Sequence, residues 1–220
     1  MILGIYCAGG FGKEVFDIAS RQNGISQQWE KIIFIDDFAL DDSDVYLTKS
    51  YKFDSLTAKF DKSNLEIVIA NGEPFHKQVL FNKVEQAGYH FGRVQDPTAI
   101  VSPSAEIGQG VIIASFCIIA SNSKIGHNVA INVHSIIGHD IEIKDHVILS
   151  SMVNIGGFCQ IDTGTYIGMN AQIKDGLRIG KDAIIGMGAV VHHNIESDVI
   201  ALGNPARPMR RNTEKRVFKS

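Results

Sequence analysis

An aliphatic residue recurs at every sixth position from Val101 to Val191, and this period limits the possible folds more than any other feature of the chain. All sixteen positions at this spacing are Ile, Val or Leu, and thirteen are Ile, running from Val101, Ile107, Ile113 and Ile119 on to Ile173, Ile179, Ile185 and Val191. A helix has a period of about 3.6 residues and an ordinary strand a period of about two, so neither produces this pattern.

A short internal repeat of this kind predicts a β-helix, in which each hexad forms one flat face and each coil stacks on the one before. With three hexads in a triangular coil, residues 18 apart lie above one another at roughly the 4.8 Å spacing of neighbouring strands. The aliphatic column fills the prism, and smaller residues such as Ala105 and Cys117 let the chain turn its corners. About five coils fit between residues 101 and 191.

The composition narrows the class of protein. The formal net charge is −3, which gives no reason to expect nucleic acid or a membrane surface as a partner, and no run of 18 apolar residues is present. Three cysteines form no disulfide framework, and Cys117 and Cys159 are expected to be reduced residues of the β-helix interior. We expect a soluble cytoplasmic protein.

The first 22 residues predict a strand, a glycine-rich turn and a helix. Residues 2–7 are apolar, Ala8-Gly9-Gly10-Phe11-Gly12 follows, and residues 13–22 are amphipathic. Such a turn can direct backbone N–H groups at the helix N-terminus toward a phosphate, although it can also be a tight turn without a ligand. Cys7 stands where the dinucleotide fingerprint has its first Gly, which argues against a full NAD site.

Polar residues follow the next two predicted strands. Residues 31–35 run into Asp36-Asp37, and residues 66–70, which end in Ala70, run into Asn71-Gly72. The carboxyl ends of parallel strands share one sheet edge, where open α/β sheets bind ligands. We therefore predict a small Rossmann-like α/β nucleotide-binding domain over residues 1–92, a β-helix over 93–191, and a turn with a solvated basic tail over 192–220.

His139 is the strongest candidate for chemistry on the β-helix. It is followed by Asp140, and a carboxylate beside an imidazole fixes its tautomer and stabilises the imidazolium, as a general base requires. Gly157 lies one coil away and could offer its N–H to an oxyanion. A competing interpretation makes His134 and His139 two ligands of a zinc ion, but no third histidine lies at the required place.

Together with the terminal Gly203-Asn204-Pro205-Ala206-Arg207, these motifs occur in an order that resembles the hexapeptide-repeat acetyltransferases that N-acetylate nucleotide-linked 4-amino-4,6-dideoxy sugars, of the bacillosamine-pathway and perosamine types. The resemblance covers nearly the whole chain. It implies a left-handed β-helix, a homotrimer with active sites between subunits, acetyl-CoA as co-substrate, no metal, and a place in the biosynthesis of lipopolysaccharide or other surface glycans.

The resemblance also assigns residues. The base corresponds to His139 and its carboxylate partner to Asp140, while acetyl-CoA corresponds to Gly157, Met169 and Met187. The nucleotide sugar corresponds to residues of the N-terminal domain and one of the β-helix: Gly9, Gly10, Phe11, Asp36, Asp37, Ala70, Asn71 and Asn132.

Two other functions stay open at this stage. One is O-acetylation of a sugar such as sialic acid, and the other is a trimeric binding protein without activity. The sequence leaves open the nucleotide (UDP, dTDP or GDP) and the stereochemistry of the sugar, and it assigns no role to His134, His146 or the basic tail.

Overall fold

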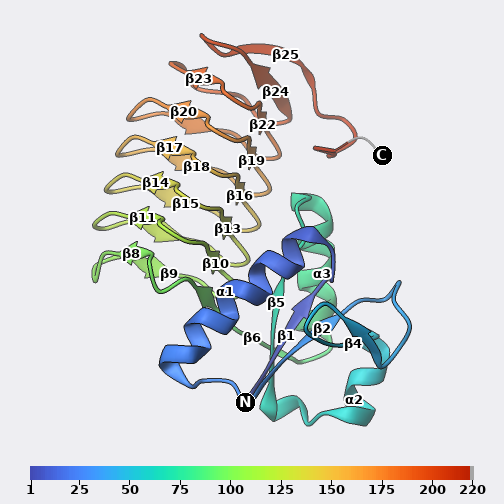
Figure 1. The fold of residues 1–220 in the computed structure, drawn as a ribbon. Helices are drawn as coiled ribbons and strands as arrows, with labels where there is room; N and C mark the ends of the chain where they lie inside the picture. The colour runs from blue at the N-terminus through green and yellow to red at the C-terminus, as the bar shows by residue number, and fades with distance from the viewer. Residues whose placement is uncertain (219–220) are drawn as a thin grey trace.

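The computed structural model describes residues 1–218 and consists of an α/β domain followed by a three-sided β-helix (Figure 1). The sheet of the α/β domain has the order β3-β4-β2-β1-β5-β6. Its strands are β1 (Ile2–Tyr6), β2 (Lys31–Ile35), β3 (Ser43–Val45), β4 (Thr48–Tyr51), β5 (Leu65–Ile69) and β6 (His90–Phe91). All strand pairs are parallel except β3 with β4, an edge hairpin that the sequence did not predict.

Helices cover both faces of this sheet. The helices are α1 (Gly10–Ser26), α2 (Leu56–Lys59) and α3 (Pro74–Gln86), with the 3₁₀ turns η1 (Phe53–Ser55) and η2 (Lys62–Asn64). Val15 and Phe16 of α1 pack with Leu3 and Ile5 of β1 on one face, and Phe81 of α3 packs on the other. The helix α1 approaches β1 so closely that a Cβ on Gly12 would lie 2.0 Å from the carbonyl oxygen of Cys7.

The β-helix has three faces, each a parallel sheet, except that the last strand of face 1 is antiparallel. Face 1 comprises β7 (Val94–Gln95), β10 (Ile112–Ile113), β13 (Ala130–Ile131), β16 (Ile148–Leu149), β19 (Tyr166–Ile167), β22 (Ile184–Ile185), β24 (Val199–Leu202) and the antiparallel β25 (Arg207–Arg211). Face 2 comprises β8 (Ile100–Val101), β11 (Ile118–Ile119), β14 (Ile136–Ile137), β17 (Asn154–Ile155), β20 (Gln172–Ile173) and β23 (Val190–Val191). Face 3 comprises β9 (Glu106–Ile107), β12 (Lys124–Ile125), β15 (Glu142–Ile143), β18 (Gln160–Ile161) and β21 (Arg178–Ile179).

The predicted fold class is confirmed, and so is the stacking of residues 18 apart. Ile119 pairs with Ile137 and Ile137 with Ile155, all pointing into the prism and at most 3% exposed. The stacking continues past Val191, where the six-residue pattern ends. Ile179 bridges Ile195 and Ile184 pairs with Ile200, so the last coil is two residues shorter than the others and falls outside the repeat.

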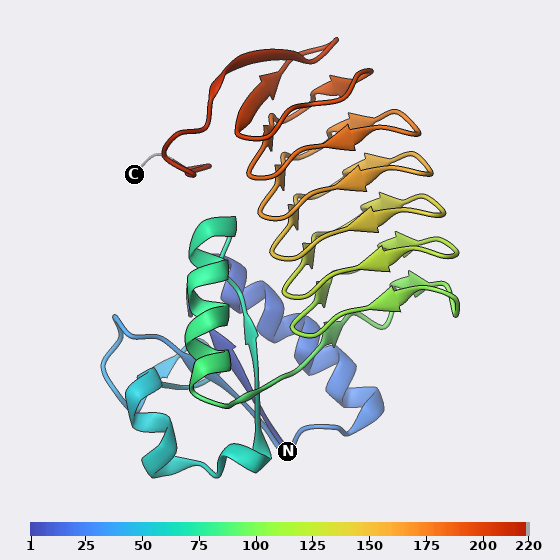
Figure 2. The same cartoon turned by 180° about the vertical axis from the view of Figure 1, so that it is seen from behind.

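The α/β domain lies against face 1 and the two corners that border it (Figure 2). We name the corners by the faces they join. From α1, Arg21 donates to Asp96 and to Ser115 on corner 1–2. From α3, the carbonyl oxygen of Lys77 accepts from Asn128 on corner 3–1. Corner 2–3 has no such partner among residues 1–218, and His139 lies there.

Candidate active site

His139 and Asp140 form a hydrogen-bonded pair on corner 2–3. The distance from His139 Nδ1 to Asp140 Oδ2 is 2.8 Å, and Asn122 Nδ2 donates to Asp140 Oδ1 at 3.2 Å. Asp140 has a φ of 55°, a left-handed corner conformation that Asp tolerates better than most residues. The hydrogen bonds from His139 and then Asn122 lower the pKa of Asp140. A carboxylate at Nδ1 keeps the proton on that nitrogen, so Nε2 carries the free lone pair.

Two residues of the next coil flank the imidazole. A Cβ built on Gly157 would lie 2.8 Å from Cε1 and 2.9 Å from Nε2 of His139, so the ring occupies the space of the missing side chain. Phe158 packs its ring edge-to-face with the imidazole at 5.0 Å. The imidazole is half exposed, with 53% of the side chain accessible. The ring is therefore held on one side and open on the other.

Gly157→Ala is expected to lower kcat by about tenfold or more by displacing the His139 ring, since small misplacements of a catalytic group are costly. The fold should survive, because the corresponding corner positions hold Ser121, Asp175 and His193 and so accommodate a Cβ. Steady-state kinetics and thermal melting test this. A Gly157→Ala enzyme with unchanged kcat would show that the position of the ring is not critical.

A cavity of about 470 Å³ opens at the carboxyl ends of β1, β2 and β5. This is the sheet edge at which the sequence predicts a ligand. Cys7 has a φ of 80°, so the backbone turns there as a glycine would. The lining includes four of the predicted nucleotide-sugar residues and six that were not predicted: Gly9, Asp36, Asp37 and Asn71, with Tyr6, Cys7, Phe38, His76, Val79 and Leu80.

The two acidic residues of this cavity also organise its walls. Asp36 accepts from the backbone N–H groups of Ala8 and Phe38, at 2.9 and 3.0 Å, and so ties the glycine-rich turn to the end of β2. Asp37 accepts from Tyr6 Oη at 2.6 Å and from Lys83 Nζ at 2.8 Å. Burial alone would raise the pKa of Asp37, but the hydrogen bonds from Lys83 and Tyr6 outweigh it, and the pKa is lowered.

The remaining predicted nucleotide-sugar residues do not line this cavity. Phe11 and Asn132 line a second cavity of about 240 Å³ between α1 and corner 1–2, together with Arg21 and Val133. Gly10 is the exposed first residue of α1. Ala70 is 3% exposed and belongs to the apolar core, so only its backbone can meet a ligand.

Met169 and Met187 lie on corner 1–2, and they are 49% and 71% exposed. Gly157 lies with His139 on corner 2–3 instead. Face 2 separates these two corners within one chain. The structure therefore brings the predicted site residues together in two groups, one beside His139 and one on the side that carries the α/β domain.

Two other histidines of the β-helix, His134 and His146, pack against neighbouring side chains. His134 stacks on Phe116 at 5.0 Å. His146 is buried under α3, its Nδ1 lies 3.0 Å from Asn128 Nδ2, and burial lowers its pKa to about 4. Within residues 1–218, no group of three or more His, Cys, Asp or Glu side chains could hold a metal ion. None of the helices described is long and apolar enough to cross a membrane.

Sequence reasoning missed several residues of these sites. Asn122 could have been found, because it lies 18 residues before Asp140 and therefore directly beside it in the stack. Phe158 could have been found from the same 18-residue spacing, because it lies one coil after Asp140. Tyr6 and Lys83 could not, since their contacts with Asp37 join elements that are far apart in the sequence.

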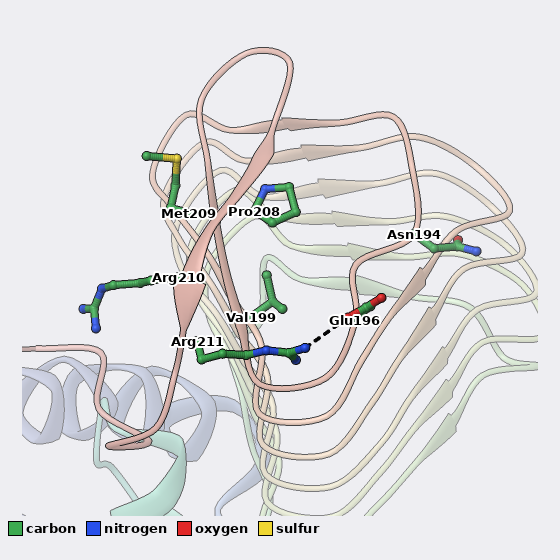
Figure 3. A pocket seen from close by; sticks show the side chains of 7 residues that line it. All are labelled: Asn194, Glu196, Val199, Pro208, Met209, Arg210 and Arg211. Carbon is green, nitrogen blue, oxygen red and sulfur yellow. Dashed lines mark hydrogen bonds and ion pairs between the residues drawn. The ribbon is translucent and has the colours of Figure 1, made fainter.

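A further cavity, of about 390 Å³, lies at the last coil and is lined by Asn194, Glu196, Val199, Pro208, Met209, Arg210 and Arg211 (Figure 3). Arg211 points toward Glu196, 3.4 Å away, while Arg210 points away from it. None of the predicted site residues lines this cavity.

A hexapeptide-repeat prism with a histidine–carboxylate pair on one corner, joined to an α/β domain with a ligand cavity, defines an acyltransferase of the hexapeptide-repeat class. Family models support this: the PglD N-terminal domain matches residues 2–84, and the bacterial transferase hexapeptide, with six repeats, matches residues 158–193. WeeI from Acinetobacter baumannii AYE is 32% identical, with a TM-score of 0.87 over 95% of this chain and 100% of that chain.

Two other solved structures share the fold at 24% identity. The acetyltransferase domain of PglB from Neisseria gonorrhoeae FA1090 has a TM-score of 0.86 over 94% of this chain and 99% of that chain. PerB from Caulobacter crescentus, in complex with CoA and GDP-perosamine, has a TM-score of 0.86 over 96% and 98%. This chain belongs to the family of hexapeptide-repeat transferases with a PglD-type N-terminal domain. The resemblance noted in the sequence is thereby confirmed.

Proposed function

We propose that this protein transfers the acetyl group of acetyl-CoA to the 4-amino group of a nucleotide-linked 4-amino-4,6-dideoxyhexose in the biosynthesis of a bacterial surface glycan. The observation that carries the proposal is the His139–Asp140 pair, in which the His139 Nε2 has no hydrogen-bond partner among residues 1–218 and lies beside Gly157. PerB, which shares the fold, was solved with CoA and GDP-perosamine, a nucleotide-linked amino sugar.

The chemistry requires one base. The sugar amine attacks the thioester carbonyl carbon, and His139 Nε2 takes the proton as the nitrogen becomes cationic. Asp140 stabilises the resulting imidazolium through Nδ1. The Gly157 N–H has no hydrogen-bond acceptor among residues 1–218 and is therefore available to stabilise the oxyanion. The C–S bond then breaks, and the imidazolium returns its proton to the CoA thiolate.

The cavity of the α/β domain suits a nucleotide. Helix α1 begins at its rim with no acidic residue in the first turn and no side-chain cap, which leaves N–H groups for a phosphate. Phe38 lines the cavity and is fully exposed, so its ring offers a surface on which a base can stack. Asp36 and Asp37 each retain lone pairs for donors of the nucleotide or the sugar.

The three faces of the prism support a trimer. The α/β domain lies against the first coils of face 1, and face 3 carries the polar residues Glu106, Lys124, Glu142, Gln160 and Arg178 on its outer side. Face 2 is uncovered yet presents Ile100, Ile118 and Ile136, which are 65%, 38% and 45% exposed. An uncovered apolar strip of this kind marks an interface.

A site shared between chains explains why the predicted residues fall into two groups. Corner 2–3 of one chain, with His139, would meet corner 1–2 of the next, with Met169 and Met187. Such a contact joins two different surfaces, and repeating it closes a ring instead of a two-fold dimer. Each active site then takes its base from one subunit and its acetyl-CoA wall, with Met169 and Met187, from another.

Mixed trimers test this arrangement. Subunits carrying His139→Ala and subunits carrying Met187→Trp are each expected to be nearly inactive alone. After mild dissociation and reassembly together, part of the activity should return, because some sites then combine an intact base with an intact acetyl-CoA wall. Wild-type subunits treated in the same way serve as the control. Mixtures that stay inactive while the control recovers would place both groups of residues in one chain.

The function itself is tested by thiol release from acetyl-CoA with a panel of nucleotide-linked 4-amino sugars. Matched sugars with a 4-hydroxyl group distinguish N-acetylation from the alternative, sugar O-acetylation. Calorimetry should show that one nucleotide sugar binds, that Asp36→Ala weakens it, and that NAD gives no heat. Turnover of the hydroxyl sugars alone, or tight binding of NAD, would contradict the proposal.

A further inference from the structure

The end of the chain crosses from the last coils of the β-helix to the α/β domain. At its start, Asn212 donates to the carbonyl oxygen of Asp182 at 2.9 Å, and Lys215 pairs with the same residue's carboxylate at 2.8 Å. The chain then runs toward the N-terminal end of α3, as both views show (Figures 1 and 2). Part of the basic tail, predicted to be solvated, is therefore anchored.

Glu73 receives the far end of this segment. The backbone N–H of Val217 donates to Glu73 Oε2 at 2.9 Å, and that of Phe218 donates to Oε1 at 2.6 Å. Both carboxylate oxygens are thus used, in charge-assisted hydrogen bonds that are stronger than neutral ones. The Phe218 ring packs edge-to-face with Tyr166 at 5.8 Å and also lies over Gly72, within 3.5 Å of where its Cβ would be.

The Asn71–Gly72–Glu73 turn connects this contact to the ligand cavity. Asn71 Oδ1 accepts from the backbone N–H of Glu73 at 2.9 Å, and Asn71 Nδ2 reaches Cys7 Sγ at 3.6 Å. Asn71 and Cys7 both line the 470 Å³ cavity. A continuous series of contacts therefore runs from the tail through Glu73 to the cavity wall.

We propose that residues 212–218 act as a strap that positions the Asn71–Glu73 turn, and that Glu73 is a positioning residue for the nucleotide sugar. This inference rests on the proposed function of the cavity. Without the strap, the turn would have to be ordered when the ligand binds, and that cost would be subtracted from the binding free energy. The base lies on corner 2–3, away from the strap, so the chemical step itself does not depend on it.

The experiment compares five variants of the whole chain: deletion of residues 217–220, Glu73→Ala, these two combined, Glu73→Gln and the control Glu214→Ala. Glu214 is an exposed acidic residue of the same tail and has no ion pair within residues 1–218. The deletion and Glu73→Ala should each raise the KM and Kd for the nucleotide sugar about tenfold, the size expected for losing hydrogen bonds to a charged group. The KM for acetyl-CoA and kcat should change less than twofold.

The conservative and combined variants sharpen the test. Glu73→Gln keeps one carbonyl oxygen as an acceptor and should give an intermediate Kd. The deletion combined with Glu73→Ala should be no worse than either alone, because both remove the same contact. Glu214→Ala should match the wild type.

Two results separate failure of the strap from failure of the function. A wild-type enzyme that neither binds nor acetylates any nucleotide amino sugar would remove the proposed function and with it the strap's role. A wild-type enzyme that binds one, with unchanged Kd in the deletion and Glu73→Ala variants, would overturn the strap alone. An increase in both KM values, accompanied by a loss of thermal stability, would also overturn it, since that pattern indicates general structural damage.

Discussion

His139→Ala is expected to lower kcat by about 10²–10⁴-fold, the range found when a general base is lost. The residue lies on an outer corner with its imidazole half exposed, so its removal leaves no buried cavity and should not disturb the stacked coils. Steady-state kinetics with the nucleotide sugar and acetyl-CoA measure the loss, and circular dichroism checks that the fold is retained.

Asp140→Asn tests the contribution of the carboxylate partner of His139. Its amide can still orient the His139 ring but cannot stabilise an imidazolium as a carboxylate does, so the loss of kcat should be smaller than for His139→Ala. Asn122→Ala, which removes the donor to Asp140, should cost less again. A His139→Ala enzyme within twofold of the wild type would remove this residue from the mechanism.

Ile155→Asp is expected to prevent folding of the β-helix. Ile155 is 3% exposed and stacks between Ile137 and Ile173 inside the prism. The narrow apolar interior offers no partner for a carboxylate, and the cost of burying one exceeds the net stability of a typical domain. Thermal melting and size-exclusion chromatography should show an unfolded or aggregated protein.

Gln160→Asp is the matched control for this change. Gln160 lies on face 3 of the same coil, but its side chain points outward and is exposed. It should melt within a few degrees of the wild type, as surface substitutions usually do. A soluble Ile155→Asp protein with a normal melting curve would mean that the interior column has been misassigned.

The β-helix could be predicted in detail because the sequence pattern that specifies it is short and recurs in every coil. Each hexad forms one face, and the same kind of aliphatic residue returns at each interior position one coil later. The aliphatic positions from Val101 to Val191 therefore determine both the stacking of the coils and its register. The same spacing places Gly157 beside His139 and Asn122 beside Asp140. The strand, turn and helix at the N-terminus could also be predicted, because the glycine-rich turn and the apolar strand are adjacent in the chain.

The tertiary structure decided which corners of the β-helix are covered by the α/β domain and which are exposed. The packing of α1 and α3 on face 1 buries His146 and leaves corner 2–3 free for His139. The pairing of Asp37 with Lys83 and of Glu73 with residues 217 and 218 joins segments 46 and about 145 positions apart. No periodicity encodes such contacts, because each depends on the path of the chain in three dimensions and occurs once. The sequence by itself therefore determined the scaffold and the neighbouring His139–Asp140 pair, and the tertiary structure determined how the cavity, the corners and the tail are arranged around them.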